Sequence, residues 1–111
     1  MNLPQITAQT VNQESAELKL NISADLEAFE GHFDDAPIIP GVEQLRWVIE
    51  FAQKCFSLEE LEVERVDALK FQNVIQPNSQ ITLNLVNKSQ RIDFTFTSGE
   101  IRHSSGKVIV K

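Results

Sequence analysis

The feature that most constrains the fold is one apolar stretch with helical spacing, which begins directly after Pro40-Gly41. Apolar side chains recur there at steps of three and four residues, and this spacing is typical of an amphipathic helix. The stripe consists of Val42, Leu45, Ile49, Ala52 and Phe56, and it is broadened by Trp47, Val48, Phe51 and Cys55. An apolar surface this wide predicts a helix that packs deeply against a sheet.

The segments on both sides of this helix alternate between apolar and polar residues, as half-buried strands do. The alternation predicts strands within 6–11 and 16–22 before the helix, and within 66–74, 81–85 and 92–96 after it. The last strands are expected to be short and bracketed by turns at Ser98-Gly99 and Ser104-Ser105-Gly106. Two strands, one long helix and a run of antiparallel strands predict an α+β protein. We expect a single hotdog domain over residues 1–111, with a curved antiparallel sheet wrapped around a long central helix.

Composition and charge exclude several classes of function. The net charge of −6 leaves no basic stripe for nucleic acid. No apolar run reaches the roughly 20 residues that cross a bilayer, and no signal peptide is visible in residues 1–10. The lone Cys55 has no partner for a disulfide or a zinc site. We therefore expect a cytoplasmic protein without nucleic-acid, membrane or metal binding.

Charge is distributed unevenly along the chain. Residues 1–64 hold 13 acidic and 3 basic side chains, whereas residues 65–111 hold 7 basic and 3 acidic ones. Solvated faces of a sheet protein are the simpler interpretation. The alternative is a basic patch for an acidic partner, with Lys70, Arg91 and Arg102 as its candidates.

His32 is the candidate catalytic residue because of its surroundings. It lies between Gly31 and Phe33, in an irregular segment that leads into the predicted helix. A neutral imidazole in a dry place can accept a proton near pH 7. The start of the helix at Gly41 and Val42 offers unpaired backbone N–H groups at the positive end of the helix dipole. This combination suits proton abstraction beside a thioester carbonyl, where the oxygen gains negative charge.

The same residues resemble the β-hydroxyacyl-acyl-carrier-protein dehydratases. The family pattern is Gly-His-Phe-Pro-Gly-x-Pro, two apolar residues, Pro-Gly and an apolar residue. It matches in register at Gly31-His32-Phe33 and at Pro37-Ile38-Ile39-Pro40-Gly41-Val42, with Asp34-Asp35 in place of the first Pro-Gly. Downstream, residues 70–81 resemble the family stretch that ends in a turn before the next strand, and Gly106-Lys107-Val108 resembles its C-terminal hairpin. Within the family, Gln44-Leu45-x-Trp47 is most similar to the small dehydratase of aryl-polyene biosynthesis.

The resemblance implies dehydration of a β-hydroxyacyl thioester to the trans-2-enoyl thioester, in fatty-acid or aryl-polyene-type synthesis. It implies that His32 is the base and that the Gly41 N–H polarises the thioester carbonyl. It implies no cofactor, since the substrate arrives on the phosphopantetheine arm of an acyl carrier protein. It also implies a homodimer with the acyl tunnel at the interface and an acidic residue supplied across it; further assembly is left open. The implied substrate-binding residues are Phe33, Pro40, Val42, Arg46 and Trp47.

Arg46 departs from the family pattern, because it stands where the family has a Glu or Asp that helps remove the β-hydroxyl. An arginine cannot release its proton at a working pH. Glu43 or Glu50, on the same helix face, could substitute as the acid, or His32 could act alone as base and then acid. The chain could instead be a non-catalytic acyl-thioester-binding subunit, or a thioesterase that uses Glu43 or Glu50. The purely structural interpretation of the three residues is a surface ion-pair ladder worth about 0.2–0.5 kcal/mol per pair.

Two further residues have a structural and a functional interpretation. Trp47 could line an acyl tunnel, but its position among apolar helix residues favours a place in the core. His103, beside Ser104-Ser105-Gly106, is interpreted as a surface or structural histidine.

Overall fold

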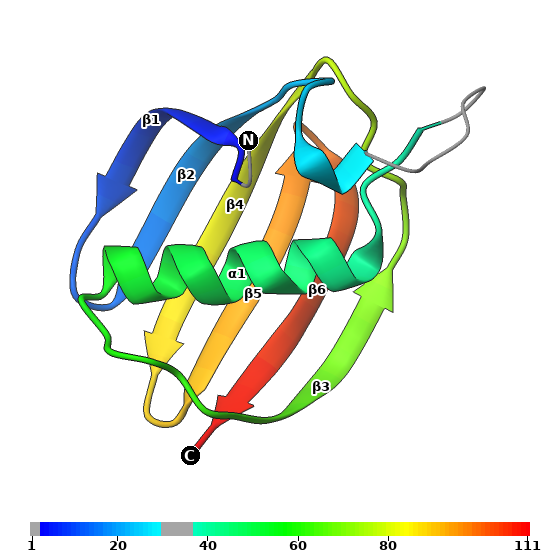
Figure 1. The fold of residues 1–111 in the computed structure, drawn as a ribbon. Helices are drawn as coiled ribbons and strands as arrows, with labels where there is room; N and C mark the ends of the chain where they lie inside the picture. Colours follow the sequence, from blue (N-terminus) through cyan, green and yellow to red (C-terminus); the bar gives the residue numbers. More distant parts are fainter. Residues whose placement is uncertain (1–2, 30–36) are drawn as a thin grey trace.

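The computed structural model describes residues 3–29 and 37–111, which form a six-stranded antiparallel sheet and one α-helix. The helix α1 crosses one face of the curved sheet (Figure 1). This arrangement confirms the predicted α+β hotdog architecture. In chain order the elements are β1 (Gln5–Val11), β2 (Ser15–Ile22), a 3-10 helix (Glu27–Phe29), α1 (Gly41–Cys55), β3 (Val63–Phe71), β4 (Ser79–Lys88), β5 (Arg91–Ser98) and β6 (Ile101–Val110).

The strand order β1-β2-β4-β5-β6-β3 separates β3 from its neighbours in sequence. After α1 the chain runs to the far edge of the sheet, where β3 pairs with β6. The segment that follows β3 then lies beside the segment that precedes α1. A backbone hydrogen bond joins the two segments: the Ile39 N–H donates to the Ile75 carbonyl over 2.9 Å. The position of β3 at the far edge of the sheet thus brings the segments around Ile39 and Ile75 together at the start of α1 (Figure 1).

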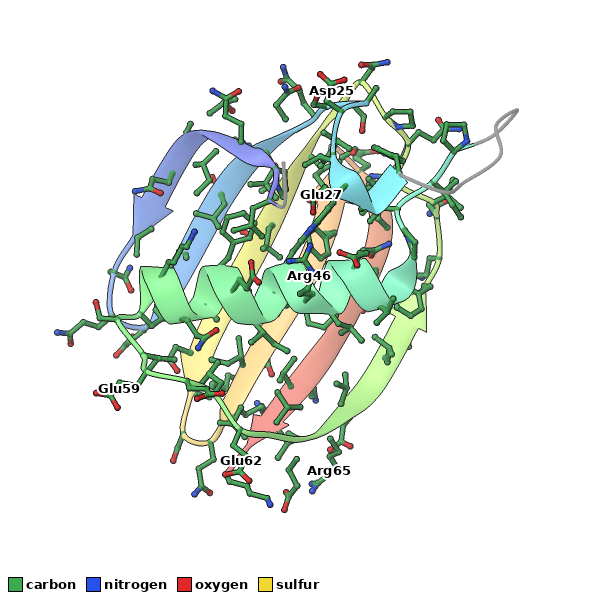
Figure 2. The ribbon with its side chains drawn as sticks, viewed as in Figure 1. Asp25, Glu27, Arg46, Glu59, Glu62 and Arg65 are labelled. Atoms are coloured by element: carbon green, nitrogen blue, oxygen red, sulfur yellow. The ribbon has the colours of Figure 1, made fainter. Side chains whose placement is uncertain are left out.

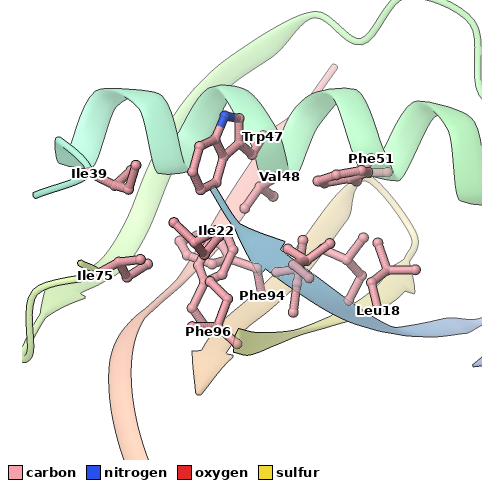
Figure 3. Packing of buried hydrophobic residues seen from close by; sticks show 14 of the residues in the cluster. Leu18, Ile22, Ile39, Trp47, Val48, Phe51, Ile75, Phe94 and Phe96 are labelled. Carbon is pink, nitrogen blue, oxygen red and sulfur yellow. The ribbon is translucent and has the colours of Figure 1, made fainter. Parts of the chain in front are cut away.

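The core fills the space between α1 and the facing side of the sheet. Trp47 is fully buried and meets the edge of Phe96, with ring centroids 6.4 Å apart and planes at 68°. Such edge-to-face pairs add about 0.5–1.5 kcal/mol beyond the apolar area that they bury. Figure 3 shows the helix side chains directed toward those of the strands. The main contributors are Leu18, Leu20 and Ile22 of β2, Leu83 and Leu85 of β4, Phe94 and Phe96 of β5, and Trp47, Val48, Phe51 and Ala52 of α1.

The buried face of α1 is rotated from the one that the spacing predicts. Val42, expected to lead the stripe, is 71% exposed, and Leu45 and Ile49 are only partly buried. The predicted helix is present, but the prediction placed its buried face at the wrong angle around the helix axis. The reason is that the polar Gln44 occupies a core position in the first turn. The buried residues are Gln44, Trp47, Val48, Phe51 and Ala52.

The predicted break at Ser104-Ser105-Gly106 was also wrong, since these residues lie inside the continuous strand β6. The other predicted turn, at Ser98-Gly99, is confirmed: the hairpin between β5 and β6 turns at Gly99, whose φ of +58° suits glycine. Gly106 is paired with Phe94 of β5, and a Cβ there would lie 2.8 Å from the Phe94 ring. The glycine therefore serves close packing rather than a turn. β3 is likewise displaced from the expected 66–74 to Val63–Phe71.

No helix within residues 3–29 and 37–111 combines the length and apolar character that a membrane span requires.

Gly106→Ala should destabilise the protein by about 1–3 kcal/mol, because the added methyl group overpacks the Phe94 ring. Urea unfolding followed by circular dichroism measures this change. Lys107→Ala, on the exposed side of the same strand, is the control and should change stability by less than about 0.5 kcal/mol. Equal stability of wild type and Gly106→Ala would contradict the close packing.

Candidate active site

A pocket of about 280 Å³ lies at the start of α1. One wall is the turn that enters the helix, and the other is the end of β3 with the chain that follows it. The fold thus builds the pocket from the two segments that the strand order brings together. Its lining residues are Ile38, Ile39, Pro40, Gly41, Gln44, Phe71, Gln72, Asn73 and Val74.

The first turn of α1 presents backbone N–H groups that have no acceptor among residues 3–29 and 37–111. Pro40 is the extended N-cap residue and supplies no side-chain cap. Its carbonyl accepts from the N–H groups of Glu43 and Gln44, at 3.1 and 3.2 Å. Within the described residues the N–H groups of Gly41 and Val42 donate to no acceptor. A helix N-terminus of this kind stabilises negative charge on a nearby oxygen.

Gly41 allows close approach to this N-terminus. A Cβ at residue 41 would lie 2.6 Å from Cζ of the Phe71 ring, so no side chain fits without moving that ring. Phe71 is itself 51% exposed. The end of β3 therefore packs directly on the helix backbone, and Phe71 gives the pocket an apolar wall beside the Gly41 N–H.

Gln44 is a functional candidate that the sequence interpretation missed. It lines the pocket and is only 4% exposed. Its amide Nε2 donates to the Ile39 carbonyl over 3.2 Å, and its Oε1 accepts from the hydroxyl of the buried Ser104 over 2.6 Å. The available signal was a glutamine inside an apolar stripe, within the Gln44-Leu45-x-Trp47 motif.

Arg46 is held by the two glutamates that share its helix face. Its guanidinium lies 2.7 Å from Glu43 and 3.1 Å from Glu50. The hydrogen bond to Glu43, together with the negative charges of both glutamates, raises the pKa of Arg46 above its ordinary value. Arg46 therefore remains a cation, as the sequence predicts. The side chains of the trio are about one-third exposed, so the ladder contributes little to stability. Figure 2 labels Arg46 on α1.

Trp47 and His103 are part of the scaffold. Trp47 has no exposed surface, which confirms its place in the core. His103 is buried, its Nε2 lies 2.6 Å from the Ser98 hydroxyl oxygen, and its Nδ1 lies 3.0 Å from the Val74 carbonyl. Because a carbonyl only accepts, Nδ1 carries the proton and donates. His103 thus fastens β6 to the wall of the pocket, which confirms the structural interpretation.

The remaining predicted residues divide into three groups. His32 and Phe33 lie outside the described residues. Pro40 and Gly41 line the pocket, whereas the exposed Val42 is not among its lining residues.

Of the basic candidates, Arg91 is paired with Asp93 at 2.9 Å. The other two, Lys70 and Arg102, are exposed and form no ion pair within the described part of the chain.

Among residues 3–29 and 37–111, no cluster of three or more His, Cys, Asp or Glu side chains is arranged to bind a metal ion.

Comparison with known proteins decides the family. Residues 8–107 match the model of the ApeI-like family, which is described as ApeI dehydratase. The chain belongs to the ApeI-like dehydratase family. It is also 31% identical over 96 residues to the 3-hydroxyacyl-[acyl-carrier-protein] dehydratase FabZ of Natranaerobius thermophilus. That match covers 81% of this chain and 63% of the FabZ protein, so the chain spans less than two-thirds of its relative.

Solved structures agree with this assignment. The dehydratase heterocomplex ApeI:P from Xenorhabdus doucetiae superposes with a TM-score of 0.87 at 25% identity, over 96% of both chains. The dehydratase domain of the polyketide PpsC from Mycobacterium tuberculosis matches with a TM-score of 0.67 at 17% identity, over 97% of this chain and 44% of that one. The second likeness shows the fold alone.

Gly41→Ala should destabilise the protein by at most about 1 kcal/mol, because the new methyl group meets the far end of the half-exposed Phe71 ring, which can move aside. Phe71→Ala removes that ring, so the double variant should lose less stability than the two single changes together. A double-mutant cycle of urea unfolding should give a coupling of at least about 0.5 kcal/mol. Additive effects would show that the ring does not restrict residue 41.

Proposed function

We propose that this protein dehydrates a β-hydroxyacyl thioester carried by an acyl carrier protein, giving the trans-2-enoyl thioester. The observation that carries the proposal is the pair of N–H groups at the start of α1, beside the pocket, for which the described part of the chain offers no acceptor, in a chain of the dehydratase family. Oxygen of a thioester carbonyl gains negative charge when the neighbouring carbon loses its proton. A donor such as the Gly41 N–H stabilises that charge selectively in the transition state.

His32 completes the proposed reaction as the base, on the evidence of its position in the Gly31-His32-Phe33 motif. Its imidazole takes the proton from the α-carbon, and the electron pair of that C–H bond moves toward the carbonyl oxygen. The pair forms the new double bond as the C–O bond to the β-hydroxyl breaks, and the departing oxygen needs one proton to form water. The protonated His32 returns that proton, so a single residue serves as base and then as acid.

Glu43 and Glu50 are weak candidates for the acid, because both already accept hydrogen bonds from Arg46. The same observation disfavours a thioesterase in which one of these glutamates activates water. It favours the second candidate function, a non-catalytic acyl-thioester-binding subunit, over hydrolysis.

The substrate class rests on the pocket and on the charges beside it. Lys70 directly precedes the pocket residue Phe71. The carbonyl of Arg102 accepts a hydrogen bond from the side-chain amide of the pocket residue Asn73. Two exposed cations in this region suit the phosphate of a phosphopantetheine arm or an acidic carrier protein. The Gln44-Leu45-x-Trp47 resemblance supports an aryl-polyene type of acyl group over an ordinary fatty acyl group.

A dimer belongs to the same proposal. In the described sheet, β3 pairs on one side only, with β6, and its residues Leu69 and Phe71 are partly exposed. An edge strand with exposed apolar residues favours pairing with another chain. The ApeI:P structure is a heterocomplex. A heterodimer would suit this chain because a related partner that carries a carboxylate could supply the acid that Arg46 cannot, whereas a homodimer would bring only a second Arg46.

His32→Ala should abolish water loss from a β-hydroxyacyl carrier-protein thioester, since no other base is proposed. Mass spectrometry of the carrier protein measures the conversion, with Lys107→Ala, on the exposed side of β6, as the control. Tight acyl binding without water loss by the wild type would favour the non-catalytic subunit. Release of free carrier-protein thiol would favour the thioesterase.

Arg46→Glu should raise the dehydration rate, because it places a carboxyl group where the family has one. General acid catalysis contributes about 10²–10⁴-fold, so an increase of at least about tenfold is expected. Arg46→Gln also removes the cation but cannot act as the acid, and it should leave the rate within about threefold of wild type. Equal rates for the Glu and Gln variants would show that this acid is not what limits the reaction.

A further inference from the structure

The buried amide of Gln44 is unusual for its position. It faces the sheet from the first turn of α1, where an apolar side chain would fill the space without needing hydrogen-bond partners. Burying an amide is costly unless its polar atoms are paired. Here both ends are paired, with the Ile39 carbonyl and the Ser104 hydroxyl. Since a carbonyl oxygen can only accept, the amide atom beside Ile39 must be nitrogen, which fixes the orientation of the side chain.

This amide holds the peptide that precedes the helix. Ile39 is fixed at its N–H by the Ile75 carbonyl and at its own carbonyl by Gln44. Pro40 follows with φ of −62° imposed by its ring. The Pro40 carbonyl is held by the N–H groups of Glu43 and Gln44. Because a peptide is planar, the Gly41 N–H then points opposite to that carbonyl, outward from the start of the helix.

Gln44 also determines which polar groups face the pocket. Both Ile39 and Gly41 line it, so an unpaired Ile39 carbonyl would present lone pairs next to the Gly41 N–H. Lone pairs would repel an oxygen that gains negative charge. With Gln44 donating to it, the carbonyl is satisfied within the protein.

We infer that Gln44, oriented by Ser104, is a positioning residue that fixes the Gly41 N–H for the thioester carbonyl; this inference rests on the proposed dehydration. Gln44 acts through residues 39–41 and does not itself touch the reacting atoms. Ser104 acts one step further away, through the amide oxygen of Gln44.

The first test needs neither substrate nor activity. The chain has four glycines, so protein labelled with ¹⁵N-glycine gives at most four backbone amide signals, and Gly41→Ala identifies that of Gly41. In the wild type the order parameter of the Gly41 amide should be near the rigid value of about 0.85. In Gln44→Met, which keeps the size but not the hydrogen bonds, it should fall below about 0.6. Gly106, inside β6, is the internal control and should remain rigid.

Ser104→Ala is the milder second variant. It removes the hydroxyl that orients the amide but leaves the Gln44 donor and the Ile39 carbonyl in place. The Gly41 order parameter should lie between the values of wild type and Gln44→Met. If Gln44→Met does not fold, as judged by circular dichroism, Ser104→Ala decides the question. An unchanged Gly41 amide in whichever variants fold would overturn the inference.

Kinetics then link positioning to the reaction. With a β-hydroxyacyl thioester, Gln44→Met should lower kcat by about ten- to hundredfold, because misplacing a catalytic donor has effects of this size. KM should stay within about twofold, since methionine replaces Gln44 in the pocket wall with a side chain of similar size. Equal losses in a purely structural variant such as Gly106→Ala would overturn the inference. A mobile Gly41 amide in Gln44→Met, together with a wild type that dehydrates nothing, would support positioning and reject the proposed function.

Discussion

The packing of α1 on one face of the sheet is the interaction on which the rest of the structure depends. Trp47, Phe51 and the strand residues that they meet are almost entirely buried, and this apolar contact fixes the helix across the sheet. In residues 3–29 and 37–111, α1 is the one α-helix that covers this face, so its packing determines where its N-terminus lies. That position is beside the end of β3, because the strand order carries β3 to the far edge. The pocket is therefore a consequence of how the core is packed, and it needs no additional element.

Most of the architecture could be predicted from local patterns, because β2, β4 and β5 alternate and the helix has its own period. The alternation of β2 identified Leu18, Leu20 and Ile22, which are all fully buried. The phase of α1 was predicted incorrectly, because hydrophobicity alone assigns Gln44 to the solvent. Only the tertiary contacts to Ile39 and Ser104 make its burial favourable. Gly106 shows the same limitation, since its role depends on Phe94 in a neighbouring strand.

The candidate site could be predicted where the chemistry lies in the backbone and its motif. Pro40-Gly41 predicts a helix start whose N–H groups lack acceptors, and α1 begins there with none for Gly41 and Val42 among the residues that the structure describes. What the sequence could not give is the opposite wall. Phe71 and the residues after it lie about thirty positions further along the chain, and they reach Gly41 only through the order of strands in the sheet. The ion pairs of Arg46 were predictable, because residues three and four positions apart on a helix are neighbours.

The polar groups around α1 divide into two regions with different consequences for catalysis. Near Gly41, the polar atoms of Gln44, Ser104 and Ile39 are paired with one another, which leaves backbone donors to face the pocket. One turn further along, Arg46 binds Glu43 and Glu50, so a cation and two occupied carboxylates stand where an acid is expected. The first region favours formation of negative charge on a carbonyl oxygen. The second offers no proton for a leaving hydroxyl. In the proposed dehydration, the first region would assist loss of the α-proton to His32, and the proton for the leaving hydroxyl would come from the protonated His32 or from another subunit.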